Sequence, residues 1–222
     1  MTLGEFNTKF RSDLSELYSV VEVSSLFKIV LEDLLFFDIT EFYLKTDYIL
    51  TDIELEKLNN FTNELKMGKP FQYIKGETEF YSYKFYVNTN VLIPRIETEG
   101  LVDWILTDNS QPKKTVIDFC SGSGCIAITI KLKRKKWDVF AMENSQKAIE
   151  LSKLNSSRHS VKINYIHADI FSSNEYDEID IIISNPPYVV ESQKKLMKSN
   201  VLNFEPENSI FVSDKNPLIF YK

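Results

Sequence analysis

The sequence contains little cysteine and histidine, and no long apolar run. Its two cysteines, Cys120 and Cys125, lie five residues apart, a spacing that suits neither a disulfide framework nor a set of metal ligands. No stretch approaches the ~18 consecutive apolar residues of a membrane span. The first residues also lack the basic and apolar regions of a signal peptide. We therefore expect a cytoplasmic protein with no metal and no membrane partner.

The acidic charge is unevenly distributed. Residues 1–68 contain 6 Lys/Arg and 13 Asp/Glu, whereas the rest of the chain contains 20 and 19. An acidic surface argues against nucleic acid as a partner, since binding phosphates requires basic groups. The acidic part would suit a basic protein partner, or it forms a solvated helical surface.

Residues 1–68 have the periodicity of helices joined by short polar segments. Thr51-Asp52-Ile53-Glu54 has the form of a capping box, which predicts the start of a helix, and Gly68 is expected to follow its end. The aromatic run from Phe80 predicts a β-hairpin. These features divide the chain into a helical domain over 1–68, a linker with a hairpin over 69–93 and a second domain over 94–222.

From residue 94 the sequence alternates strands, glycine turns and helices, which is typical of an α/β fold. A helix is expected over 97–106, and the β-branched run at 179–183 predicts a buried strand of a parallel sheet. The expected strands are 115–119, 138–142, 162–167 and 178–184. In the spatial order third, second, first, fourth, which is what the resemblance described below implies for these four strands, the last of them would be an exposed apolar edge, which favours aggregation.

Asn185-Pro186-Pro187-Tyr188 follows the last of these strands. Two prolines cannot continue a strand ladder, and ligands of open α/β sheets bind beyond the carboxyl ends of the strands. The Asn185 side-chain oxygen and the Pro186 carbonyl are acceptors that suit a planar NH2 group, on which Tyr188 would stack.

A glycine loop follows the first of these strands. Gly122 and Gly124, two of only six glycines, stand between a strand and a helix, and Glu143 ends the next strand. The glycines allow a ligand to approach the backbone and leave N–H groups free at the helix start. Glu143 could accept both hydroxyls of a ribose. This loop alone also fits a dinucleotide fingerprint.

Asp118 favours a cofactor without phosphate, and Asp169 is a further candidate for contact with the cofactor. Asp118, at the end of the first strand, would repel a pyrophosphate but attract the ammonium group of S-adenosylmethionine, whose carboxylate would then meet the loop N–H groups. Asp169, after the third strand, either accepts from the adenine amino group or caps a helix.

The ordered motifs resemble one family closely. The Asp-x-x-x-Gly-x-Gly loop and Asn-Pro-Pro-Tyr are shared by many amino-methyltransferases. The segments at 91–99 and 70–76, with Phe80-Tyr81, narrow the resemblance to the release factor glutamine methyltransferases, the HemK/PrmC family.

The resemblance implies a Rossmann-like class I methyltransferase fold that uses S-adenosyl-L-methionine, with a helical N-terminal domain that recognises the substrate. It implies methylation of the side-chain amide nitrogen of the glutamine in the Gly-Gly-Gln motif of class I peptide chain release factors. A monomer is expected. The expected catalytic residues are Asn185, Pro186 and Tyr188, and Pro187 joins them in binding substrate. The expected cofactor-binding residues are Asp118, Cys120, Ser121, Gly122, Gly124, Glu143, Asp169 and Asn185.

Some positions depart from the family pattern. Cys120 stands where the family usually has glycine, so this turn is expected to avoid positive φ. Ile96 replaces a proline, and Glu143 replaces the commoner aspartate. Arg95 and Glu97, close to the pocket, are expected to be structural, as in an ion pair between domains.

The sequence also stops where the family begins its next helix, so we expect a chain truncated within the methyltransferase domain. Two other functions stay open at this stage. One is a nucleic-acid methyltransferase acting on adenine N6, and the other is an inactive remnant that only binds the cofactor.

Overall fold

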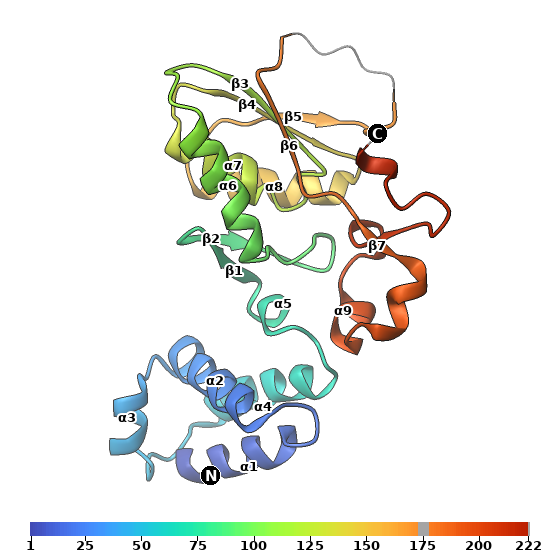
Figure 1. Cartoon of the computed structure of the whole chain (residues 1–222). Coiled ribbons are helices and arrows are strands. Elements are labelled where there is room, and N and C mark those ends of the chain that lie inside the picture. Colours follow the sequence, from blue (N-terminus) through green and yellow to red (C-terminus); the bar gives the residue numbers. More distant parts are fainter. Residues whose placement is uncertain (173–177, 222) are drawn as a thin grey trace. The chain divides into compact units, whose positions relative to one another are not determined.

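A computed structural model describes residues 1–172 and 178–221 (Figure 1). The chain forms two compact units, Met1–Ile74 and Lys75–Lys222. The hairpin that the sequence places in a linker lies within the second unit. No helix in the described part of the chain is both long enough and apolar enough to span a bilayer.

The first unit is helical, and four of its helices begin at a capping box. At the predicted box, the Thr51 side chain accepts from the Glu54 N–H, while the Glu54 carboxylate accepts from the Thr51 N–H at 2.8 Å. Such reciprocal bonds satisfy N–H groups that have no partner within the helix. The helices are α1 (Leu3–Leu14), α2 (Val20–Val30), the π-helix η1 (Leu31–Leu35), α3 (Ile39–Leu44), α4 (Asp52–Lys66) and α5 (Phe71–Lys75).

Aromatic and leucine side chains fill the core of the first unit. The Phe27 ring meets Phe10 at 5.6 Å and Phe42 at 5.1 Å between centroids, distances typical of favourable ring pairs. Gly68 has a φ of +79°, as expected of a glycine that follows a helix.

The second unit opens with the antiparallel hairpin of β1 (Glu77–Phe80) and β2 (Tyr83–Tyr86). Its two turn residues, Tyr81 and Ser82, both have positive φ, which matches the twist of a tight hairpin. Buried Asn155 of α8 (Gln146–Arg158) accepts from the Tyr86 N–H at 2.6 Å and donates to the Tyr86 carbonyl. The hairpin is thereby fixed to α8, and the chain leaving β2 has a defined direction.

A parallel four-stranded sheet forms the centre of this unit. The strands are β3 (Thr115–Phe119), β4 (Asp138–Glu143), β5 (Asn164–His167) and β6 (Ile181–Ser184). Their order, β5-β4-β3-β6, confirms the predicted arrangement. Helices α6 (Glu97–Asp108), α7 (Cys125–Lys133) and α8 lie on one side of the sheet in Figure 1, and α7 and α8 pack on its strands. The α/β fold class is confirmed.

The prediction that the run at 179–183 is a buried strand was partly wrong. Ile183 is 3% exposed, but its neighbour Ile182 is 64% exposed. Among the described strands β6 pairs only with β3, and an edge strand leaves side chains open to water. The described chain after β6 forms short elements: β7 (Val189–Val190), η2 (Glu191–Leu196), α9 (Ser199–Phe204), η3 (Glu207–Ser209), β8 (Phe211–Val212) and η4 (Ile219–Tyr221).

Candidate functional site

The glycine loop joins β3 to α7 in a left-handed turn. Cys120, Gly122 and Gly124 have φ angles of +58°, +52° and +78°. The prediction that Cys120 avoids positive φ is therefore wrong. A side chain in this region costs roughly 1–2 kcal/mol, and tertiary bonds offset that cost, since the Ser121 N–H donates to the Met142 carbonyl of β4 at 3.1 Å.

The two loop glycines are required for different reasons. A Cβ atom on Gly124 would lie 2.0 Å from Ser152 Oγ, so this glycine allows α7 and α8 to approach closely. A Cβ atom on Gly122 would meet nothing within 4 Å. Gly122 therefore faces open space, where a ligand could lie against the backbone.

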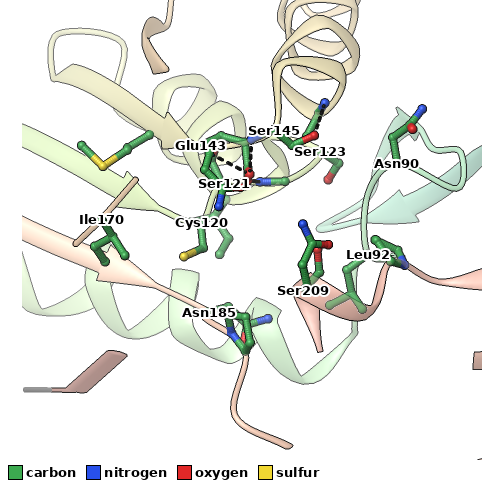
Figure 2. Close-up of a pocket in the computed structure, with 18 of the residues that line it drawn as sticks. Asn90, Leu92, Cys120, Ser121, Ser123, Glu143, Ser145, Ile170, Asn185 and Ser209 are labelled. Atoms are coloured by element: carbon green, nitrogen blue, oxygen red, sulfur yellow. Dashed lines mark hydrogen bonds between the residues drawn. The ribbon is translucent and has the colours of Figure 1, made fainter. Parts of the chain in front are cut away.

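Glu143 holds the loop at the end of β4. One carboxylate oxygen, Oε2, accepts from the Gly122 N–H at 2.9 Å, and Oε1 accepts from the N–H groups of Asn144 and Ser145 at 3.0 Å each (dashed bonds in Figure 2). A carboxylate offers about four lone-pair sites, so about one stays open for a ligand hydroxyl. The Gly122 N–H, expected to meet the cofactor carboxylate, is already used.

Asp118 lies beneath the loop and not in a cavity. It is 0% exposed, and its Oδ2 accepts from the Ala127 N–H at 3.2 Å. Within the described residues, Oδ1 has no hydrogen-bond partner. Burial raises the pKa of the Asp118 carboxyl well above its usual range, an effect that the Ala127 N–H opposes and the Glu143 charge adds to.

A cavity of about 320 Å³ opens beside this loop, and we call it the loop cavity (Figure 2). Its lining includes the predicted residues Cys120, Ser121, Gly122, Glu143, Asp169 and Asn185, together with Ser123, Asn90, Leu92 and Ser209. Its volume lies in the range of ligand pockets. Gly124 and Asp118 are not among the residues that line it.

The Cys120 thiol faces the loop cavity as a neutral group. Burial, followed by the negative charges of Glu143 and Asp118, raises the pKa of this thiol to about 12. The thiolate is the nucleophilic form of cysteine. Cys120 is therefore a weakly polar part of the wall.

Asp169 lies in the same wall, together with an aromatic pair that no sequence motif indicates. Asp169 Oδ1 accepts from the Phe171 N–H at 2.9 Å, and residues 170–172 form a turn and not a helix. Phe171 and Phe220 line the loop cavity with their ring centroids 5.0 Å apart. A planar ligand could stack there.

A second cavity, of about 360 Å³, lies beside Pro186 and Tyr188, and we call it the proline cavity. Tyr188 is 63% exposed, whereas Pro186 and Pro187 are buried. Asn185 Nδ2 donates to Thr98 Oγ1 at 3.4 Å. Because the amide nitrogen is engaged in this way, the Asn185 oxygen is the atom left to accept from a ligand.

The two cavities share part of their walls. Asn185 lines both, together with Leu92, Arg95, Thr98 and Ser209. The loop cavity contains an acid at a strand end, as a nucleoside ribose requires, and the proline cavity contains acceptors for an NH2 group. An arrangement with Asn185 on the common wall suits transfer of a small group from one ligand to another.

Partly exposed Arg95 and buried Glu205 form a contact between distant parts of the sequence. Arg95 Nη2 lies 2.6 Å from Glu205 Oε1, and Glu205 Oε2 accepts from the Ile93 N–H at 3.2 Å. For Arg95 the expected pairing between domains was wrong, because its partner Glu205 lies in the same unit, while the structural role expected of Glu97 stays a prediction. Glu205, whose side chain is 2% exposed, has no sequence signal that distinguishes it from a surface glutamate.

The sequence of the chain is similar to those of known proteins. The model of the methyltransferase small domain family matches residues 89–204. The release factor glutamine methyltransferase of Flavobacterium psychrophilum is 38% identical over 227 residues, which span 100% of this chain and 80% of that protein. The enzyme of the same name from Bacteroides thetaiotaomicron is 36% identical, over 99% of this chain and 80% of its own length.

The chain belongs to the release factor glutamine methyltransferase family. Streptococcus pneumoniae has a further relative, 33% identical over 100% of this chain and 78% of that protein. Among solved structures, the hMettl16 catalytic domain in complex with the MAT2A 3'UTR hairpin 6 is 14% identical, with a TM-score of 0.46 over 74% of this chain and 58% of that one. The family assignment is based on the sequence relatives.

Proposed function

We propose that this chain methylates the side-chain amide nitrogen of the glutamine in the Gly-Gly-Gln motif of class I peptide chain release factors, with S-adenosyl-L-methionine as methyl donor. This protein methylation would modify factors that take part in translation termination. The observation that carries the proposal, beside the family relatives, is that Asn185 lines both cavities. A residue on the common wall can touch the amide that receives the methyl group.

The loop cavity fits this cofactor. Glu143 has about one free lone-pair site for a ribose hydroxyl. Phe171 offers an apolar ring face for the adenine, and Asp169 lies beside it. Gly122 leaves open space at the backbone. When bound, S-adenosylmethionine supplies an activated methyl group attached to a sulfonium.

The proline cavity fits the amide that accepts the methyl group. An amide nitrogen is a weak nucleophile because its lone pair is delocalised into the carbonyl. The Asn185 oxygen and the Pro186 carbonyl accept its two hydrogens and orient the nitrogen toward the loop cavity, while Tyr188 covers the amide plane. These fixed dipoles would stabilise the positive charge that develops on nitrogen, and that charge would be lost when the methylated nitrogen releases one of its two hydrogens to water as a proton. Holding both reactants in place would lower the barrier further.

Mass analysis of a release factor, incubated with this chain and S-adenosylmethionine, tests the proposal. We expect a gain of one methyl group on the peptide that contains Gly-Gly-Gln, and none when its glutamine is replaced by asparagine. Asn185→Ala should lower kcat by about 10²–10³-fold, as expected when one donor or acceptor that stabilises a transition state is removed. Because Asn185 is half-buried on a cavity wall, the melting temperature should change little.

Two results would contradict the proposal. The first is methylation of DNA or RNA adenine by this chain with no methylation of the release factor. The second is full activity of the Asn185→Ala variant, which would show that the amide of the substrate is held elsewhere.

A further inference from the structure

The loop cavity has neutral hydroxyl and amide donors in its wall but little positive charge to balance an anion. S-adenosylmethionine ends in an amino acid, with an ammonium and a carboxylate. Its carboxylate was expected at the loop N–H groups, but the Gly122 N–H donates to Glu143 and the Gly124 N–H donates to the Ser121 carbonyl at 2.8 Å. Glu143 and Asp169 add negative charge to the wall. Neutral donors do not offset these charges, so a cationic partner from another segment would favour the carboxylate most.

Arg95 is the one cationic side chain among the described residues that line either cavity. We propose that Arg95 binds the carboxylate of S-adenosylmethionine, and that Glu205 holds the guanidinium in position for it. This inference rests on the proposed function, since it assumes that the loop cavity binds this cofactor.

The geometry of the ion pair supports the assignment. A guanidinium has five N–H donors in a rigid fork that suits carboxylates. The contact at 2.6 Å engages the Nη2 end of Arg95 with Glu205, and the side chain is still 38% exposed. The same glutamate also accepts from the Ile93 N–H, so it fixes both the backbone and the side chain of this segment.

A simple deletion of Arg95 would leave Glu205 as a buried, unpaired charge, which is strongly destabilising. The comparison therefore uses Glu205→Gln and the double variant Arg95→Met with Glu205→Gln, neither of which buries a lone charge. Thermal unfolding without ligand verifies that both are folded. The Arg95→Lys variant, with Glu205 intact, gives a second comparison. It keeps a positive charge at this position but lacks the rigid fork of N–H donors of a guanidinium.

Isothermal titration then measures two ligands that differ in one group. S-adenosylhomocysteine contains the carboxylate, and its decarboxylated analogue lacks it but keeps the ammonium, the ribose and the adenine. We expect the double variant, which lacks Arg95, to bind S-adenosylhomocysteine about 10–100-fold more weakly than the Glu205→Gln variant does. This loss of affinity is the one expected for a charge-assisted hydrogen bond. The decarboxylated analogue should change by less than about 2-fold, within the ordinary effect of a substitution that makes no direct contact.

Arg158→Met is the matched control, because Arg158 forms an ion pair with Glu77 at 3.0 Å but lines neither cavity. It should leave both affinities unchanged. Equal weakening of both ligands by loss of Arg95 would overturn the inference, since it would show that Arg95 shapes the cavity. No weakening of either would overturn it as well.

The two proposals fail in different ways. If the wild-type chain binds S-adenosylhomocysteine but methylates no release factor, the proposed function fails while the role of Arg95 stands on the binding data. If the wild-type chain binds neither ligand, both proposals fail.

Discussion

At the residue scale, Asp118 places an ionisable group where water cannot reach it. A carboxyl whose pKa is raised by folding contributes stability that is complete below its pKa in the unfolded chain, about 4, and is lost as the pH rises through its pKa in the folded chain. Burial raises that folded-state pKa well above the usual range. The wild-type chain should therefore lose stability from about pH 4 upward because of this group.

Asp118→Asn removes this titration and keeps an oxygen that can accept from the Ala127 N–H. We expect the difference in free energy of unfolding, wild type minus variant, to fall as the pH rises from 4. Urea unfolding over a series of pH values measures this difference. Subtracting the variant's free energy of unfolding from that of the wild type removes the contributions of the other acidic residues, which both proteins share. A difference independent of pH would show that Asp118 titrates normally in the folded chain.

The sequence indicated which residues lie at the loop, but not the hydrogen bonds that these residues form. Gly122, Glu143 and Asn185 line the cavities as expected. It did not predict that Glu143 would accept from the Gly122 N–H, because such a bond depends on how β4 meets the loop. The φ of Cys120 was wrong for a related reason, since the bonds around a residue can hold it in a conformation that its own preference opposes.

At the element scale, Gly124 and Gly122 provide a matched pair within one loop. Gly122→Ala adds only the cost of a side chain at positive φ, about 1–2 kcal/mol. Gly124→Ala adds a collision with Ser152 Oγ, and we expect a total of at least about 3 kcal/mol. Denaturant unfolding without ligand measures both.

The collision has its own control. Ser152→Ala in the Gly124→Ala background removes the atom nearest to the new Cβ, and it should recover part of the lost stability. Equal costs for the two glycine variants would mean that α7 and α8 do not approach as closely as the structure shows.

The order of the strands was expected from the family resemblance, since the rule that connections between parallel strands are right-handed permits other orders as well. The four strands and the helix from Glu97 follow from hydrophobic patterns within each segment. The role of Asn155 could not be predicted in this way. Its buried amide contacts the hairpin and also donates to the Ser123 carbonyl of the loop at 2.9 Å, contacts that exist only after three distant segments have packed.

At the scale of the whole chain, long-range polar contacts shape the candidate site. Arg95 and Glu205 are far apart in the sequence, and nothing near either of them indicates the other. Hydrophobic period and turn residues are local signals, so they predict elements but not which charges meet. The sequence therefore indicated the loop and the Asn-Pro-Pro-Tyr segment, while the wall between the two cavities required the structure.

The edge of the sheet has a consequence for solubility. Ile182 lies in register with Ile117 of β3 and is 64% exposed on a strand that pairs on one side only, within the described residues. An exposed apolar edge can pair with a second copy. Ile182→Thr keeps a β-branched residue in the strand and should reduce the association of this 222-residue chain, measured by light scattering against concentration. Its free energy of unfolding should change by less than about 0.5 kcal/mol.

Ile183→Thr is the control, because Ile183 is 3% exposed and a polar group there should cost about 2–3 kcal/mol. Equal destabilisation by both would show that Ile182 is covered in solution.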